Sequence, residues 1–227
     1  MDANRHSRSN RVCHFCDIPN QINAEEFDLP IAESEHFFAV ASIGGFVPGW
    51  TLVCPKEHRL NLAGLYETVE FVEFSSRVGS AVGHAYGEKV VVFEHGCRQA
   101  GSLTGCGTNH AHLHLVPFNG SLKAVVRHFD PTGQWTTGRA RDVNLLVAGQ
   151  EYLLMAESLR SLDTAALMRV MEVPRSQYFR LALASALGLE ASKADYRAYP
   201  FVDLATQAAS RLRADLRSSL KSLKRVA

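Results

Sequence analysis

The sequence has no long apolar run and almost no net charge. Across its 227 residues, no stretch is long and apolar enough to span a bilayer. The polar N-terminus carries arginines but lacks the apolar core of a secretory signal. A formal net charge of +1 gives no bulk attraction toward nucleic acid or an anionic membrane. We therefore expect a cytoplasmic protein whose partner is neither a membrane nor a nucleic acid.

Cysteine is also scarce, with five residues in all, of which Cys13 and Cys16 form the one close pair. Cytoplasmic thiols stay reduced, so this pair suggests a metal before a disulfide. Two thiolates separated by two residues can supply half of a tetrahedral zinc site, and the other ligands must come from elsewhere. His58, after an expected strand, and His110 are candidates. The alternative is that both cysteines are merely buried thiols.

Histidine is the residue that the sequence concentrates, because three histidines alternate with small or apolar residues within 109–118. A period of two is typical of a β-strand, which predicts that His110, His112 and His114 share one face. The upstream residues 101–108 are flexible enough for backbone N–H groups to converge on an anion. Neutral imidazoles beside such a loop suit phosphorus chemistry. The alternative is a surface strand or an adventitious metal-binding row.

The apolar pattern predicts an α+β fold with an antiparallel sheet, because short loops join successive strands. Before residue 119 we expect a hairpin, a long helix, a strand and the histidine strand, over 37–55, 62–86, 89–94 and 109–118. After it we expect a short helix capped by Ser121, a strand, a helix and an amphipathic helix, over 121–129, 152–155, 174–188 and 201–223.

The pattern His-x-His-x-His followed by two apolar residues resembles the histidine triad superfamily of nucleotide hydrolases and transferases. The resemblance runs from Cys13 to Phe118. It implies the histidine triad fold, with a sheet of about five strands and a long helix, over residues 11–120. Residues 121–227 are then a mainly helical appendage packed on this domain. Related proteins often pair as homodimers through the sheet edge or a helix, so pairing is an expectation here as well.

The sequence is also similar to the galactose-1-phosphate uridylyltransferase branch of that superfamily. In that branch a Cys-x-x-Cys pair, a histidine after a Pro-x-His step and the first triad histidine bind zinc. The resemblance therefore implies a zinc site made of Cys13, Cys16, His58 and His110. Four protein ligands close the coordination shell, so the zinc is expected to be structural and to take no part in the reaction.

The resemblance further implies that His112, the middle histidine, is the nucleophile. It would attack an α-phosphate, form a nucleotidyl-histidine and release the leaving group, after which water or another acceptor cleaves the intermediate. His114 would touch the phosphate or the leaving group and could donate a proton. The loop would hold the phosphoryl oxygens through its backbone amides and one hydroxyl, with the residues Gly105, Cys106, Gly107 and Thr108.

Several positions depart from the family pattern. Glu94 stands where related proteins have the asparagine of an Asn-x-Gly step, so Glu94 or His95 is expected to contact the substrate or leaving group. The alternative is that both are ordinary residues at the end of a strand. Ser42 falls near the place of an aspartate that binds ribose hydroxyls, and Gly49-Trp50 replaces a Gly-His or Thr-His pair. The uridylyltransferase branch has glutamine where this chain keeps His114, which favours hydrolysis over transfer.

The appendage offers one further candidate for substrate binding. Gln177 and Arg180 are three residues apart near the start of an expected helix, where an anion is favoured. Arg180 or Arg175 could therefore meet a distal phosphate. The alternative is a capped helix whose polar residues face solvent.

These observations predict an enzyme that binds a nucleotide or nucleotide conjugate. The first hypothesis is a hydrolase that cleaves a nucleoside-phosphate linkage in a dinucleoside polyphosphate, a phosphoramidate or a nucleotide conjugate. The second is a nucleotidyltransferase or phosphorylase that uses phosphate or a sugar phosphate as acceptor. The third is a zinc-stabilised nucleotide-binding module without turnover.

Overall fold

The computed structural model describes residues 13–20 and 25–226, and an eight-stranded sheet organises them. The strand order is β1-β2-β3-β5-β4-β7-β8-β6, and every pairing is antiparallel. The strands are β1 (Ala32–Glu33), β2 (Phe37–Ala41), β3 (Thr51–Pro55), β4 (Val90–Gly96), β5 (Leu113–Pro117), β6 (Thr136–Gly138), β7 (Tyr152–Ala156) and β8 (Ala166–Val170).

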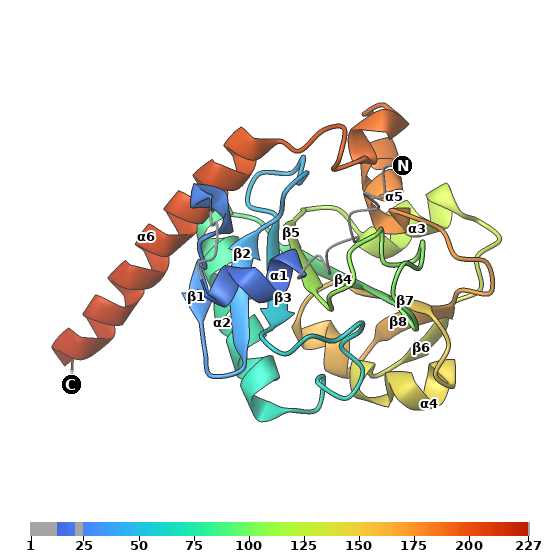
Figure 1. Ribbon diagram of the computed structural model, residues 1–227, viewed down its shortest axis with the longest axis horizontal. Coiled ribbons are helices and arrows are strands. Elements are labelled where there is room, and N and C mark those ends of the chain that lie inside the picture. Colours follow the sequence, from blue (N-terminus) through green and yellow to red (C-terminus); the bar gives the residue numbers. More distant parts are fainter. Residues whose placement is uncertain (1–12, 21–24, 227) are drawn as a thin grey trace, which may run out of the picture.

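Helices cover both faces of the sheet (Figure 1). The α-helices are α1 (His14–Asp17), α2 (Val69–Tyr86), α3 (Leu122–Phe129), α4 (Val143–Val147), α5 (Tyr178–Ala186) and α6 (Val202–Val226). Short 3₁₀ turns are η1 (Ile18–Asn20), η2 (Glu26–Asp28), η3 (Ala140–Asp142), η4 (Arg160–Asp163) and η5 (Ala191–Ala194). Among the described residues, no helix combines the length and apolarity needed to cross a membrane.

The alternation of side chains along each strand produces two separate cores. On one face, Phe37 and Ala39 of β2 pack with α2 and with the first half of α6, which runs along this side of the molecule (Figure 1). On the other face, Phe38 and Val40 pack with α3 and α5. Because β2 to β5 and β7 are buried on both faces, their sequences read as near-continuous apolar runs.

The α+β prediction is confirmed, and the five strands expected before residue 120 are β1 to β5. The sheet does not end there. Strand β7 pairs with β4 from Val92 opposite Ala156 to Gly96 opposite Tyr152, and β8 and β6 follow. The appendage is therefore helical in most of its ordered residues but extends the same sheet. The division into 11–120 and 121–227 stays a prediction.

The ends of several elements differ from the predictions. The long helix begins at Val69 rather than at residue 62, and the helix expected from 174 begins at Tyr178. The histidine strand begins at Leu113, so His114 is the one triad histidine inside it. Its ladder stops there because the Ala111 N–H donates to the Arg59 carbonyl instead of to β3. By contrast, Ser121 caps α3 as expected, accepting from the Ala124 N–H.

Candidate active site

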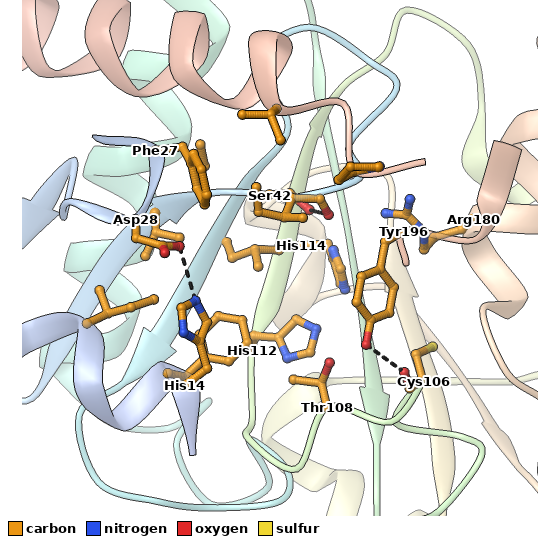
Figure 2. A pocket seen from close by; sticks show the side chains of 18 of the residues that line it. His14, Phe27, Asp28, Ser42, Cys106, Thr108, His112, His114, Arg180 and Tyr196 are labelled. Atoms are coloured by element: carbon orange, nitrogen blue, oxygen red, sulfur yellow. Dashed lines mark hydrogen bonds and ion pairs between the residues drawn. The ribbon is translucent and has the colours of Figure 1, made fainter. Parts of the chain in front are cut away.

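The last two triad histidines open on a cavity of about 350 Å³ between the sheet and the C-terminal half of the chain (Figure 2). Six of the predicted substrate and catalytic residues besides Arg180 reach it, namely Ser42, His95, Cys106, Thr108, His112 and His114. Arg180 reaches it from α5. The remaining wall is mostly apolar, with Phe15, Ile18, Phe27, Val40, Ile43 and Leu52.

His112 is held as a neutral imidazole with one free nitrogen. Its Nδ1 lies 2.8 Å from the His110 carbonyl oxygen and must donate to it, since a carbonyl only accepts. Nε2 therefore keeps its lone pair. Burial lowers the pKa of His112 to about 4, with Arg180 among the charges that add to this effect. At neutral pH the whole population of His112 is available as a nucleophile.

His114 has the opposite arrangement of protons. The Trp50 indole N–H donates to Nδ1 of His114 at 2.9 Å, and an indole nitrogen can only donate. Nδ1 of His114 is therefore the unprotonated nitrogen, and Nε2 carries the hydrogen. Burial holds the pKa of His114 well below its usual value, so the ring stays neutral and the Trp50 hydrogen bond selects its tautomer. Its ring lies 4.6 Å from that of His112, so a hydrogen-bond donor lies beside His112.

His95 reaches the same space from β4. Its ring packs edge-on against His114 at 5.8 Å and against Phe179 at 5.2 Å. Burial lowers the pKa of His95 to about 3, so this imidazole is neutral too. Its Nε2 is buried without a hydrogen-bond partner among the residues that the structure describes. A buried orphan of this kind is unusual and favours a ligand atom at that position.

Glu94, which the sequence placed beside the substrate, does not line the cavity. Its carboxylate accepts from the Leu62 N–H at 2.6 Å, the Tyr66 hydroxyl at 2.7 Å and the Tyr152 hydroxyl at 2.9 Å. These partners lie on the opposite face of the sheet from His95. Strand alternation predicts that Glu94 and His95 point to opposite faces of the sheet, because neighbouring residues of a strand do so. Glu94 is thus a buried structural carboxylate.

The glycine-rich loop forms hydrogen bonds within itself that were not expected. The N–H groups of Cys106 and Thr108 donate to the carbonyls of Leu103 and Gly105, so neither is free for a phosphate. Gly105 and Gly107 do not line the cavity. A side chain at Gly105 would collide with the Cys97 sulfur, and one at Gly107 with Arg197. Of this loop, Cys106 and Thr108 reach the cavity.

Arg180 is a buried cation at the edge of the cavity. Its guanidinium donates to three neutral oxygens, those of the Gln177 side chain, the Ala194 carbonyl and the Gly44 carbonyl. Burial lowers its pKa to about 10, which still leaves it charged at neutral pH. Gln177 serves to hold Arg180 and is not itself in the cavity. Arg175 is exposed and lies over the Phe129 ring, away from the site.

Three polar residues at the cavity, Asp28, His14 and Tyr196, belong to no motif and were not predicted as substrate-binding residues. Asp28, a buried carboxylate on η2, pairs with His14 at 3.2 Å. This pair raises the pKa of His14. Tyr196 donates to the Cys106 carbonyl at 3.3 Å. Figure 2 shows Asp28 and His14 at one side of the cavity, Arg180 and Tyr196 at the other, and His112 and His114 between them.

A second cluster lies next to the cavity. The ligand atoms of Cys13, Cys16, His58 and His110 all lie within 4.8 Å of one another. The sulfur-to-nitrogen distances are 3.5 Å for Cys13 to His110, 3.6 Å for Cys16 to His110 and 3.4 Å for Cys16 to His58. A tetrahedral ion with Zn–S bonds of about 2.3 Å and Zn–N bonds of about 2.05 Å separates such atoms by about 3.6 Å.

The protonation of His110 also fits a metal ligand. Its Nε2 donates to the buried Pro55 carbonyl at 2.8 Å, which leaves Nδ1 with a lone pair facing the two sulfurs. Phe15, next to the cysteines, stacks on both His110 and His112, with ring centroids 5.6 and 5.7 Å apart. The four predicted ligands therefore come together and could hold a metal ion. One of these ligands, His110, lies two residues before His112.

The geometry thus contains an imidazole with a free nitrogen, a neighbouring imidazole N–H and a buried guanidinium, a set able to attack and bind a phosphoryl group. The HIT domain family matches residues 23–120. That segment is therefore a HIT domain, and the family expected from the histidine spacing is confirmed. Proteins of this family are nucleotide-binding hydrolases and transferases.

Three solved structures are similar to part of this chain, and two of them are described as histidine triad or Hit-like proteins. A hypothetical histidine triad nucleotide-binding protein from Sulfolobus tokodaii is 26% identical, with 48% of this chain and 71% of that chain covered and a TM-score of 0.39. A Hit-like protein involved in cell-cycle regulation from Bartonella henselae is 25% identical, with 44% of this chain and 74% of that chain covered and a TM-score of 0.34. A Streptococcus mutans protein is 27% identical, with 48% of this chain and 67% of that chain covered and a TM-score of 0.37. No curated protein matches the chain.

Proposed function

We propose that this protein is a nucleotide hydrolase that cleaves a nucleoside-phosphate linkage through a nucleotidyl-histidine at His112. The observation that carries the proposal is the 2.8 Å hydrogen bond from His112 Nδ1 to the His110 carbonyl. It leaves Nε2 unprotonated toward a cavity lined by His114 and Arg180. The candidate substrates are dinucleoside polyphosphates, nucleoside phosphoramidates and other nucleotide conjugates.

The reaction has two displacements at phosphorus. Nε2 of His112 attacks the α-phosphorus, the N–P bond forms, and the bond from phosphorus to the leaving group breaks with its electron pair on the leaving atom. Water then attacks the same phosphorus, the N–P bond breaks, and a nucleoside monophosphate and a proton are released. The Nε2–H of His114 and the Thr108 hydroxyl donate hydrogen bonds to the phosphoryl oxygens as their charge increases.

The test is turnover and covalent labelling on a panel of adenosine and uridine compounds. The wild-type protein should consume at least one of them and show, by intact mass, a transient increase of one nucleotidyl group. His112→Ala should abolish both signals, while His128→Ala, an exposed histidine on α3, should leave them unchanged. Turnover that survives in His112→Ala would contradict the proposal.

Added phosphate separates hydrolysis from transfer. A hydrolase releases the nucleoside monophosphate whatever the phosphate concentration. A phosphorylase releases a nucleoside diphosphate in proportion to phosphate, and this product would replace the hydrolase proposal by the transferase alternative. Tight nucleotide binding with neither product nor adduct would favour the binding module without turnover.

We also propose that Cys13, Cys16, His58 and His110 bind one structural zinc ion. With all four ligands from the protein, the ion would fix the start of the segment that carries His112 and tie α1 to the sheet. Purified protein should contain about one zinc per chain, and Cys13→Ser should lose the zinc and unfold at lower temperature. Cys54→Ala is the control, because Cys54 is buried in β3 outside the cluster and its loss should lower stability without releasing zinc.

A further inference from the structure

Arg180 has no carboxylate in direct contact with it among the described residues. Its side chain is 3% exposed, and its three hydrogen-bond acceptors are uncharged oxygens. Within the described part of the chain it forms no ion pair. Asp195 acts on Arg180 without touching it, and the Gln177 amide, which donates to Asp195 at 3.2 Å, lies between the two. A buried charge without a paired opposite charge is costly, so this arrangement favours an anionic ligand.

The charge lies next to the reacting histidines. The guanidinium lies 5.0 Å from the centre of the Trp50 ring, and the same indole holds His114. Arg180, His95, His112 and His114 all line the same cavity. An anion bound to Arg180 would therefore share this cavity with a phosphate bound at His112.

His95 supplies a second polar group on that side of the triad. Its side chain is 5% exposed, and its Nε2 has no protein partner within the described residues. The ring contacts His114 on one side and Phe179 of α5 on the other, so it stands between the triad and the helix that carries Arg180. A ligand oxygen at this place would satisfy the orphaned nitrogen.

We propose that Arg180 and His95 form a subsite for the phosphate that follows the scissile bond. The substrate is then a nucleotide with a pyrophosphate linkage, and phosphoramidates and neutral leaving groups are disfavoured. This proposal rests on the proposed cleavage at His112. When the α-phosphorus is attacked, the P–O bond to the next phosphate breaks and its electron pair stays on that bridging oxygen, where Arg180 stabilises the added negative charge.

The first experiment compares kcat/KM for a diadenosine polyphosphate and adenosine phosphoramidate, which share a nucleoside and differ in the leaving group. Wild type should prefer the polyphosphate. Arg180→Gln should lower its kcat/KM about 100-fold, the range of a hydrogen-bonded charge, and change the phosphoramidate less than threefold. Arg180→Lys should recover part of the loss, and Arg175→Gln, exposed on the same segment, should change neither.

Equal losses on both substrates, or a wild-type preference for the phosphoramidate, would overturn the subsite. A nucleoside diphosphate formed only with added phosphate would overturn it too, since Arg180 would then bind the acceptor and not the leaving group.

Binding separates failure of the subsite from failure of the proposed hydrolysis. In His112→Ala, which cannot form the adduct, adenosine α,β-methylene diphosphate should bind at least tenfold more tightly than adenosine monophosphate by calorimetry. The difference should vanish when Arg180→Gln is added. This readout needs no turnover, so it stands even when no substrate is cleaved. Equal affinity for the two nucleotides would contradict the subsite.

Discussion

Trp50 assigns the proton of His114 with one hydrogen bond. The indole N–H donates to Nδ1 at 2.9 Å, which keeps the hydrogen of His114 on Nε2, the nitrogen that can donate to a phosphoryl oxygen. The family resemblance suggested a departure at Gly49-Trp50, and it is this tryptophan that holds the third triad histidine. A single buried donor thus decides whether His114 can act as a donor itself.

Replacing Trp50 with Phe should slow the reaction without removing the nucleophile. The phenyl ring fills most of the space but donates nothing, so His114 samples both tautomers and its Nδ1 is left without a partner. We expect kcat to fall about tenfold, which corresponds to a lost hydrogen bond of about 1.4 kcal/mol. Nitrogen chemical shifts of His114 should show the mixed tautomers.

Trp135→Phe is the matched control, because Trp135 is the other tryptophan and its indole nitrogen has no partner within the described residues. It should leave kcat and the His114 spectrum unchanged. If Trp50→Phe kept both the rate and a single tautomer, the hydrogen bond would not be what fixes His114.

Glu94 makes the stability of the protein depend on pH. Burial raises the pKa of Glu94 from 4.5 to about 7, against the lowering effect of its three hydrogen bonds. A raised pKa means that the folded state binds the proton more tightly than the unfolded state. The stability that protonated Glu94 contributes is therefore fully present below about pH 4.5, and this contribution is lost as the pH rises through about 7.

Comparison with Glu94→Gln should isolate this effect, since the amide is neutral at every pH. Relative to the variant, the wild type should lose about 3 kcal/mol of unfolding free energy between pH 4.5 and 7, and little more above that. Denaturant unfolding of both proteins across this range measures it. Parallel pH profiles would show that Glu94 titrates normally.

The loop of residues 101–108 is an element held in place from the appendage. Glu151, just before β7, accepts through one carboxylate oxygen from the Ser102 and Thr104 hydroxyls, both at 2.7 Å. The Asn109 side chain accepts from the Gly101 N–H at 2.7 Å at the other end. These contacts position Thr108 and Cys106 at the cavity, although the loop contains no regular structure.

Removing the Glu151 carboxylate should loosen this loop alone. In Glu151→Ala both hydroxyls lose a charged acceptor, so local opening should become easier by about 2 kcal/mol and amide exchange in 101–108 about 30-fold faster. In Glu151→Gln the amide oxygen can still accept from both, and exchange should change only a few fold. Hydrogen-exchange mass spectrometry measures this, with β4 as the internal reference. Identical exchange in Ala and Gln would contradict the anchor.

At the scale of the molecule, one sheet joins the HIT domain to the appendage. β4 pairs with β5 on one side and β7 on the other, so its edge is closed within the chain. The outer strands β1 and β6 have two and three residues, which leaves short edges for another copy. The sheet therefore offers only short edge strands for homodimerisation, and pairing stays a prediction.

A fragment of residues 1–120 should not be a folded monomer. It would expose the β4 edge from Val92 to Gly96, and Phe93 and His95 would lose their contacts with Phe179. Exposed apolar edge strands pair or aggregate. Size-exclusion chromatography with light scattering and an NMR spectrum of the fragment test this. A dispersed spectrum from a monomer would show that the domain stands without the appendage.

The sequence by itself determined the local patterns. Apolar runs within 37–55 predicted β2 and β3, Ser121 predicted the start of α3, and the spacing of the histidines predicted the family. These features depend on neighbours within a few residues, where periodicity and capping chemistry decide the outcome. The ends of elements were less accurate, because capping and long-range hydrogen bonds set them.

Only the tertiary structure decided which distant residues complete the site. Trp50 meets His114 across 64 positions, and Arg180 enters the cavity from α5, beyond the HIT domain. Such contacts depend on the pairing of β4 with β7 and on how α5 packs over it, which the burial of many side chains determines together. The spacing of residues along a strand indicates which face of the sheet each side chain points to. Which distant residue that side chain meets depends on the register of the whole sheet.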